Sequence, residues 1–152
     1  MNKEQSKLEV EKIVNKFLEI PEKEIDNMPE EQIKFRFIEP LFEALGWKRE
    51  DIEKEKRVLK GRADYILKIG NQNRLVIEAK KTSVKLLEEE GRQAVSYAHH
   101  KNIKFSVLTN FKQIRVYHAL SNIKNINKNL LKDDKGYFWL NCEKFIEQFD
   151  RL

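Results

Sequence analysis

Asp64, Glu78 and Lys80 have the side-chain types needed to hydrolyse a phosphodiester. Thirteen residues separate Asp64 from Glu78, and Lys80 follows Glu78 by two positions. Carboxylate oxygens are the ligands that Mg²⁺ prefers, and the ion offsets the charge that grows on the phosphoryl oxygens in the transition state. A neighbouring amine can orient or deprotonate the attacking water. We therefore expect the two acids to bind metal and Lys80 to activate water.

The segments that carry these residues have the pattern of one β-hairpin. Residues 63–69 and 74–81 are apolar stretches joined by the turn-prone residues 70–73. Side chains alternate across a strand, so Glu78 and Lys80 share one face. With the turn centred near Asn71, Asp64 lies opposite Glu78, with β-carbons about 5 Å apart.

The charge balance at this point favours a bound cation. Residues 75–80 form an apolar strand, so the charges of Glu78 and Lys80 are not expected to be ordinary surface charges. Two carboxylates against one ammonium leave a negative charge that a buried ion pair would not balance. The carbonyl of Ala79 is a further oxygen ligand for Mg²⁺, for which Mn²⁺ can substitute. A buried ion pair with a structural role is the alternative.

Two basic residues flank the proposed triad. Arg62 precedes Ala63-Asp64, and Lys81 follows Lys80 directly. Both are expected to bind DNA phosphates, which positions a duplex without reading its sequence. The chain contains no glycine-rich phosphate loop, so we expect it to bind no nucleotide.

The composition limits the class of protein. The 152 residues are enough for one domain with its own core. The net charge of +5 permits nucleic-acid binding through a local patch but does not require it. No apolar run approaches the ~20 residues that span a bilayer, and a single cysteine, Cys142, suits a reducing compartment. We expect a cytoplasmic protein with no membrane partner.

The periodicity of apolar residues predicts the remaining elements. Helices are expected over residues 6–20, from about 29 to 45, over 83–100 and over 143–152, and strands over 52–59, 63–69, 74–81, 105–108, 114–117 and 137–140. Pro40 lies inside the second helix and predicts a kink or a broken turn there. The fold class is α/β (α+β), with a central mixed sheet of about five strands flanked by helices.

Three short motifs together resemble a known family. They are Ala63-Asp64-Tyr65, Ile77-Glu78-Ala79-Lys80-Lys81 and the Gln93-x-x-x-Tyr97 element on the following helix. The chain resembles the PD-(D/E)xK nuclease domain that opens type I restriction motor subunits and the fused type IIG restriction enzymes. The resemblance covers about residues 30–119. It implies a restriction-endonuclease-like core within a single nuclease domain over 1–152, expected to be the N-terminal piece of a larger enzyme.

The resemblance also implies roles for three further residues. Gln93 and Tyr97 are expected to support the active site, by contacts near Lys80 or with a DNA phosphate. An acidic residue on the early helix completes the metal site in the family, and Glu39 is the candidate here. The alternatives are a core tyrosine capped by glutamine and a solvated glutamate at the edge of the apolar stripe.

The expected function is that of a Mg²⁺-dependent DNA endonuclease domain in a type I or type IIG restriction system. Its partners would be double-stranded DNA and other domains or subunits of the restriction enzyme. Two alternatives stay open. One is a catalytically silent DNA-binding or assembly module of the same fold, and the other is a structure-selective nuclease resembling a junction resolvase, which would act as a symmetric dimer.

Overall fold

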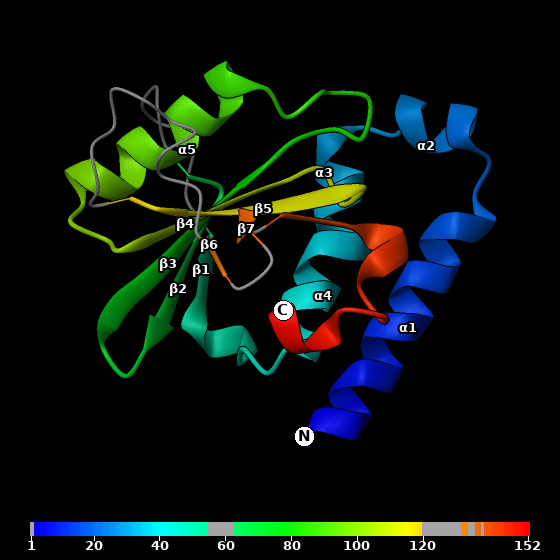
Figure 1. Ribbon diagram of the computed structural model, residues 1–152, viewed down its shortest axis with the longest axis horizontal. Coiled ribbons are helices and arrows are strands. Elements are labelled where there is room, and N and C mark those ends of the chain that lie inside the picture. The colour runs from blue at the N-terminus through cyan, green and yellow to red at the C-terminus, as the bar shows by residue number, and fades with distance from the viewer. Residues whose placement is uncertain (1, 55–62, 120–131, 134–135, 138) are drawn as a thin grey trace.

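A six-stranded mixed sheet forms the centre of the molecule (Figure 1). The computed structural model describes residues 2–54, 63–119, 132–133, 136–137 and 139–152. The strands are, in sheet order, β1 Ile52–Lys54, β2 Tyr65–Ile69, β3 Gln72–Ala79, β4 Phe105–Thr109, β5 Gln113–His118 and β8 Trp139–Asn141. Of these pairs only β3–β4 is parallel. The predicted mixed-sheet fold class is confirmed, with one more strand than expected.

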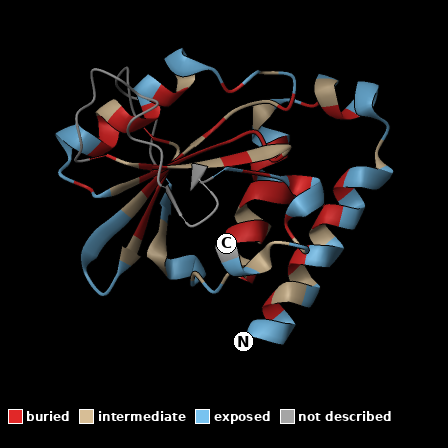
Figure 2. Ribbon diagram, viewed as in Figure 1, coloured by how far each residue is buried: buried red, intermediate tan, exposed pale blue. Residues whose placement is uncertain are grey.

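Helices cover both faces of this sheet. Helix α5, Glu88–His100, connects β3 to β4 and packs on one face, where it shares a core with Val76 and Leu108. Helix α1 (Lys3–Glu19) and the helical segment over residues 30–44 pack on the other face, with Ile77 and Val107. Figure 2 shows buried residues on both sides of the strands. The alternation along β3 therefore decides which layer each of its side chains faces.

The N-terminal helix begins earlier than its apolar pattern indicates. Asn2 and Gln5 form a reciprocal capping box that starts α1 at Lys3 rather than near Ser6. A short helix, α2 Glu22–Asn27, follows Pro21 and was not expected. A six-residue helix carries too little periodic signal to be predicted from sequence.

The helix expected from about residue 29 to 45 is divided by a wider turn. It consists of α3 Glu30–Ile33, the π-helical segment η1 Lys34–Ile38 and α4 Glu39–Ala44. The Glu39 N–H donates to the carbonyl of Lys34, five residues back. Pro40 explains this turn, because it has no N–H for the carbonyl of Arg36 and its ring would clash with that carbonyl in a regular α-helix. The predicted irregularity is therefore a π turn.

The β2–β3 hairpin closes on a two-residue turn and contains one bulge. Gly70 has φ +62 at the first turn position, as a type II′ turn requires, and Ile69 pairs with Gln72. Lys68 pairs with Asn73, but Leu67 pairs with Leu75, so Arg74 is an extra residue on β3. The turn is therefore centred between Gly70 and Asn71. Because the bulge adds one residue to β3, the strands pair in the expected register from Leu67–Leu75 onward.

Other boundaries differ from the predicted ones. Helix α5 begins at Glu88, and residues 83–87 are not helical. The C-terminal segment forms the 3₁₀ turns Cys142–Lys144 and Phe149–Arg151 instead of a continuous helix. Short strands β6 Lys132–Asp133 and β7 Gly136–Tyr137 make a separate ribbon. Residues 55–59 of the expected edge strand lie outside the described residues.

No helix within the described ranges combines the length and the apolar character that crossing a bilayer requires.

Candidate active site

Asp64 lies directly before β2, beside the C-terminal end of β3, which carries Glu78. The Asp64 N–H donates to the carbonyl of Ile77 at 2.9 Å, a bond outside the regular ladder, since Ile77 already pairs with Tyr65. The side chain turns back to the same strand, and Asp64 Oδ2 accepts a hydrogen bond from the Ala79 N–H at 2.8 Å. The β2–β3 ladder has the expected register as far as Tyr65–Ile77. The Asp64–Glu78 pair expected next in that register is not part of the ladder.

Glu78 and Lys80 lie next to each other on the same face of β3. Lys80 Nζ is 3.3 Å from Glu78 Oε1. Glu78 alternates with Ile77 and Ala79, which pack toward α1 and α4, so it faces the α5 side of the sheet. The side chains of Asp64, Glu78 and Lys80 keep 13%, 14% and 22% of their surface exposed. A ligand can therefore reach all three from solvent.

Glu78 has a strongly perturbed acidity. Burial, assisted by the negative charge of Asp64, raises the pKa of Glu78 to about 7. Lys80 acts in the opposite direction, and the charge of Glu30 adds a small further increase to this pKa. A carboxyl whose pKa is raised by a second carboxylate is typical of a site built to hold a cation.

Lys34 joins this group from the other side of the hairpin. Its Nζ lies 2.6 Å from Asp64 Oδ1 and 3.0 Å from Glu31 Oε1. Burial lowers the pKa of Lys34, but its hydrogen bonds with Asp64 and Glu31 outweigh burial, so the pKa lies above that of an ordinary lysine. Lys34, Glu30 and Glu31 were not predicted as site residues. No local pattern in the sequence marks Lys34 as buried.

Glu39 is engaged elsewhere in the structure. Its Oε2 accepts a hydrogen bond from the hydroxyl of Tyr65 at 2.8 Å, and its Oε1 lies 2.9 Å from Lys54 Nζ. Tyr65 pairs with Ile77 and packs in the core on the α1 side, away from the face of Glu78. The structure therefore does not bring Glu39 together with Asp64 and Glu78 as the family resemblance implied.

The oxygen ligands available for a metal are few. Within the described ranges, no group of three or more His, Cys, Asp or Glu side chains is arranged to hold an ion. Asp64 and Glu78 provide two carboxylates, and the carbonyl of Ala79, which lies between Glu78 and Lys80 in the chain, is a third candidate oxygen. Mg²⁺ commonly takes one or two protein carboxylates and completes its shell with water and phosphate oxygens, so this donor set fits the ion.

Gln93 and Tyr97 are one turn apart on α5 but differ in burial. Tyr97 is buried in the core between α5 and the sheet, with Val76 and Leu108. Gln93 is exposed, and within the described ranges no hydrogen bond joins it to Lys80. Tyr97 thus lies in the layer that Glu78 faces, while Gln93 points to solvent.

Of the two residues expected to bind phosphate, Lys81 and Arg62, the structure describes only Lys81. Lys81 follows β3 and is half-buried, and its carbonyl accepts a hydrogen bond from the Val84 N–H. Arg62 lies outside the described residues.

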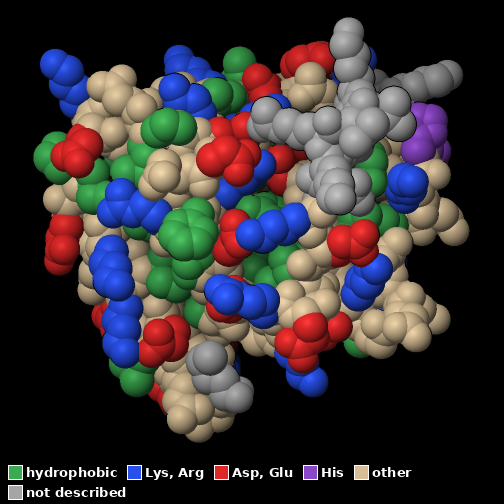
Figure 3. All heavy atoms as spheres, turned by 180° about the vertical axis from the view of Figure 1, so that it is seen from behind, with side chains coloured by type: hydrophobic (Ala, Val, Ile, Leu, Met, Phe, Trp, Pro, Cys, Tyr) green, Lys and Arg blue, Asp and Glu red, His purple; other side chains and the backbone are tan. Residues whose placement is uncertain are grey.

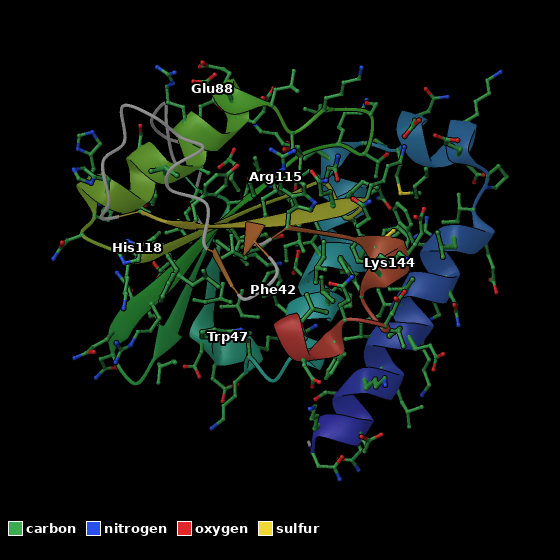
Figure 4. All side chains as sticks on the ribbon, viewed as in Figure 1. Phe42, Trp47, Glu88, Arg115, His118 and Lys144 are labelled. Carbon is green, nitrogen blue, oxygen red and sulfur yellow. The ribbon has the colours of Figure 1, made fainter. Side chains whose placement is uncertain are left out.

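A larger hollow lies at the opposite end of the sheet. This cavity, of about 900 Å³, is lined by Phe42 and Trp47 (labelled in Figure 4) and by the first residues of β3 and β4. The described residues that line it include no acidic side chain. This described lining therefore lacks the carboxylates that metal-assisted chemistry requires.

Comparison with known proteins identifies the family. The family model described as "Type I restriction enzyme R protein N terminus (HSDR_N)" matches residues 29–130, which span the helix of Lys34, the hairpin and α5. Comparison with curated proteins and with solved structures found no match. The match covers well over half of the chain, so the chain belongs to the family of type I restriction enzyme R protein N-termini.

Proposed function

We propose that this chain is a Mg²⁺-dependent DNA endonuclease domain that hydrolyses phosphodiester bonds within a restriction system. The observation that carries the proposal is the grouping of Asp64, Glu78 and Lys80 at one end of the β2–β3 hairpin: Asp64 Oδ2 accepts a hydrogen bond from the Ala79 N–H at 2.8 Å, and Lys80 Nζ is 3.3 Å from Glu78 Oε1. The family match supports the restriction context. The metal and the cleavage reaction are inferred from the chemistry of the side chains.

The charges around the pair suit one divalent ion. Four carboxylates, those of Glu30, Glu31, Asp64 and Glu78, act on this region, and two ammonium groups, those of Lys34 and Lys80, oppose them. Four negative and two positive charges leave a balance of −2 when Glu78 is ionised. One Mg²⁺ ion would neutralise that balance, and its bound waters would supply the nucleophile.

Each residue has a distinct proposed role. Asp64, Glu78 and the Ala79 carbonyl hold the ion, and Lys80 orients or deprotonates the attacking water. Mn²⁺ can replace Mg²⁺ because it accepts the same oxygen donors.

Five residues are proposed to act around this centre. Lys81 and Arg62 bind phosphates. The exposed Gln93 contacts DNA, and the buried Tyr97 supports the site from the same helix. Glu39 remains a proposed metal ligand, but to bind the ion it would have to give up its present partners, Tyr65 and Lys54. Residues 1–152 form one nuclease domain in this proposal, with its core at about 30–119.

A nicking assay tests the proposal. Supercoiled plasmid is incubated with Mg²⁺ or Mn²⁺ and the parent chain, alone and assembled with its partner subunits. We expect Lys80→Ala to lower the nicking rate by about a hundredfold or more, the range typical of a lost general base. Lys12→Ala, which changes an exposed residue of α1, is the matched control and should nick at the parent's rate.

Two results would contradict the proposal. Nicking by Lys80→Ala at the parent's rate would remove Lys80 from its assigned role. DNA binding by the assembled parent without any nicking in either metal would favour the silent binding module.

A further inference from the structure

Lys34 is the one charged residue that is buried within the described part of the chain, with 7% of its surface exposed. Burying an ammonium group is costly unless partners compensate for the lost water. Here the partners are Asp64 Oδ1 at 2.6 Å and Glu31 Oε1 at 3.0 Å, and the ring centroid of Tyr65 lies 5.9 Å away. The ammonium thus lies against the acid that the proposed function assigns to metal.

The contacts of Asp64 make this position significant. Asp64 Oδ2 is held by the Ala79 N–H, and Oδ1 is held by Lys34. Both carboxylate oxygens are therefore occupied by donors in the metal-free site. A divalent ion at Asp64 would compete directly with the Lys34 ammonium, because two cations repel each other strongly at such distances.

The helical segment that carries Lys34 also carries its second partner, the side chain of Glu31. Lys34 is the first residue of the π segment η1, next to the hairpin that carries Asp64. The side chain of Glu31 is 73% exposed and lies one turn before Lys34. An ammonium that leaves Asp64 can therefore keep Glu31 as its counter-ion and turn toward solvent.

We propose that Lys34 serves as the built-in cation of the metal-free site: it holds Asp64 in position and gives up that carboxylate when a divalent ion binds. This inference rests on the proposed function. Lys34 is a positioning residue in this scheme, since it acts through Asp64. Before the metal binds, the Lys34 ammonium keeps the acidic pair partly neutralised and ordered. Because the ion must displace this ammonium, Lys34 also weakens the affinity of the site for the metal.

The first test measures Mn²⁺ binding by calorimetry, without DNA. Lys34→Met keeps the length and apolar stem of the side chain but removes its charge. We expect the variant to bind Mn²⁺ about tenfold more tightly or better, because a competing unit charge is gone. The matched control is Lys112→Met, which breaks another lysine–aspartate pair, the 2.7 Å contact with Asp26, and should not change the affinity.

The outcomes separate this inference from the proposed function. Asp64→Asn should abolish Mn²⁺ binding by the parent. If it does, but Lys34→Met binds Mn²⁺ no more tightly than the parent, the role of Lys34 is overturned and the metal site stands. If the parent shows no Asp64-dependent binding, both are overturned.

A second measurement uses the parent chain, so that it does not depend on how a variant folds. Lysine side chains are labelled with ¹⁵N, and Lys34→Arg identifies the Lys34 ammonium signal. We expect this signal to be protected from exchange in the metal-free protein and to lose that protection on addition of Mg²⁺, while the Lys112 signal stays unchanged. A Lys34 signal that stays protected at saturating Mg²⁺ would show a purely structural ion pair and overturn the inference.

Discussion

Glu78 gives the proposed metal site a pH dependence near neutrality. Burial and the charge of Asp64 raise the pKa of Glu78 from 4.5 to about 7. The folded protein therefore holds this proton more tightly than the unfolded chain does. The resulting stabilisation is fully present below pH 4.5 and is lost as the pH rises through 7.

The first prediction concerns the metal-free protein. Between about pH 5 and pH 8, ionisation of Glu78 should lower the free energy of unfolding by roughly 3 kcal/mol. Glu78→Gln removes the ionisable group, so its stability should change less over this range. Urea denaturation in the presence of EDTA measures the difference. Equal pH dependence of the parent and the variant would show that Glu78 titrates normally.

A second prediction concerns Tyr65. Its hydroxyl donates to Glu39 at 2.8 Å, and burial, with this hydrogen bond, raises the pKa of Tyr65 above that of a free tyrosine. Tyr65→Phe leaves the Glu39 carboxylate with one hydrogen-bond donor fewer in a mostly buried position. We expect the free energy of unfolding to fall by about 1–3 kcal/mol.

The control for Tyr65→Phe is the double variant with Glu39→Gln. An amide tolerates the lost hydrogen bond better than a carboxylate does, so the two effects should not add. Thermal denaturation measures all four proteins. Additive effects on the free energy of unfolding would show that the interaction between Tyr65 and Glu39 contributes nothing to stability.

At the level of the elements, Pro40 accounts for the wide turn that precedes it. Pro40→Ala restores an N–H that can bond the carbonyl of Arg36, so the helix can continue in a regular α form. We expect η1 to become α-helical and the Lys34–Asp64 contact to lengthen, because removing the extra residue from the turn rotates α3 relative to α4. A crystal structure of the variant measures both changes. Persistence of the π turn would assign it to packing instead of proline.

The hairpin and the placement of Glu78 beside Lys80 could be predicted because their signal is local. Alternation along β3 sets Glu78 and Lys80 on one face, and the apolar run around them indicates a strand. The position of Lys34 could not be predicted, since a lysine between Ile33 and Phe35 looks like part of a solvated helix face. Its burial depends on Asp64, thirty residues further along the chain.

The helix after β3 was predicted too long for a similar reason. Thr82 donates its hydroxyl to the carbonyl of Ile25 at 2.8 Å and contacts Asp26 Oδ1 at 3.0 Å. These bonds tie the segment after β3 to α2, more than fifty residues earlier. The helical pattern of residues 83–100 contains no sign of this tether, so the start at Glu88 was not predictable.

For the whole molecule, the distribution of charge bears on DNA binding. Figure 3 shows lysine and arginine side chains next to aspartate and glutamate over one face of the protein. The net charge is +5, from 30 basic and 25 acidic residues. Such a surface attracts a polyanion weakly, so we expect the proposed DNA binding to rest on a few phosphate contacts near the proposed metal site.

The last prediction follows from this distribution. Lys81→Ala should weaken binding of duplex DNA equally for unrelated sequences and reduce the salt dependence by about one phosphate contact. Lys16→Ala, in the last turn of α1, is the control. Fluorescence anisotropy at several salt concentrations measures both variants, in the Lys80→Ala background to prevent cleavage. A loss confined to one DNA sequence would instead show base recognition.

The bulge at Arg74 determines how β2 pairs with the strand that carries Glu78. In a hairpin with a two-residue turn, paired residues are always separated by an even number of intervening positions, but thirteen residues lie between Asp64 and Glu78. Without the additional residue, Tyr65 would pair with Val76 instead of Ile77, and every pair of the hairpin beyond the bulge would shift by one position. Two acids at an odd spacing can therefore face each other across such a hairpin only with this insertion or with an odd-length turn, which gives a simple parity test for any related hairpin.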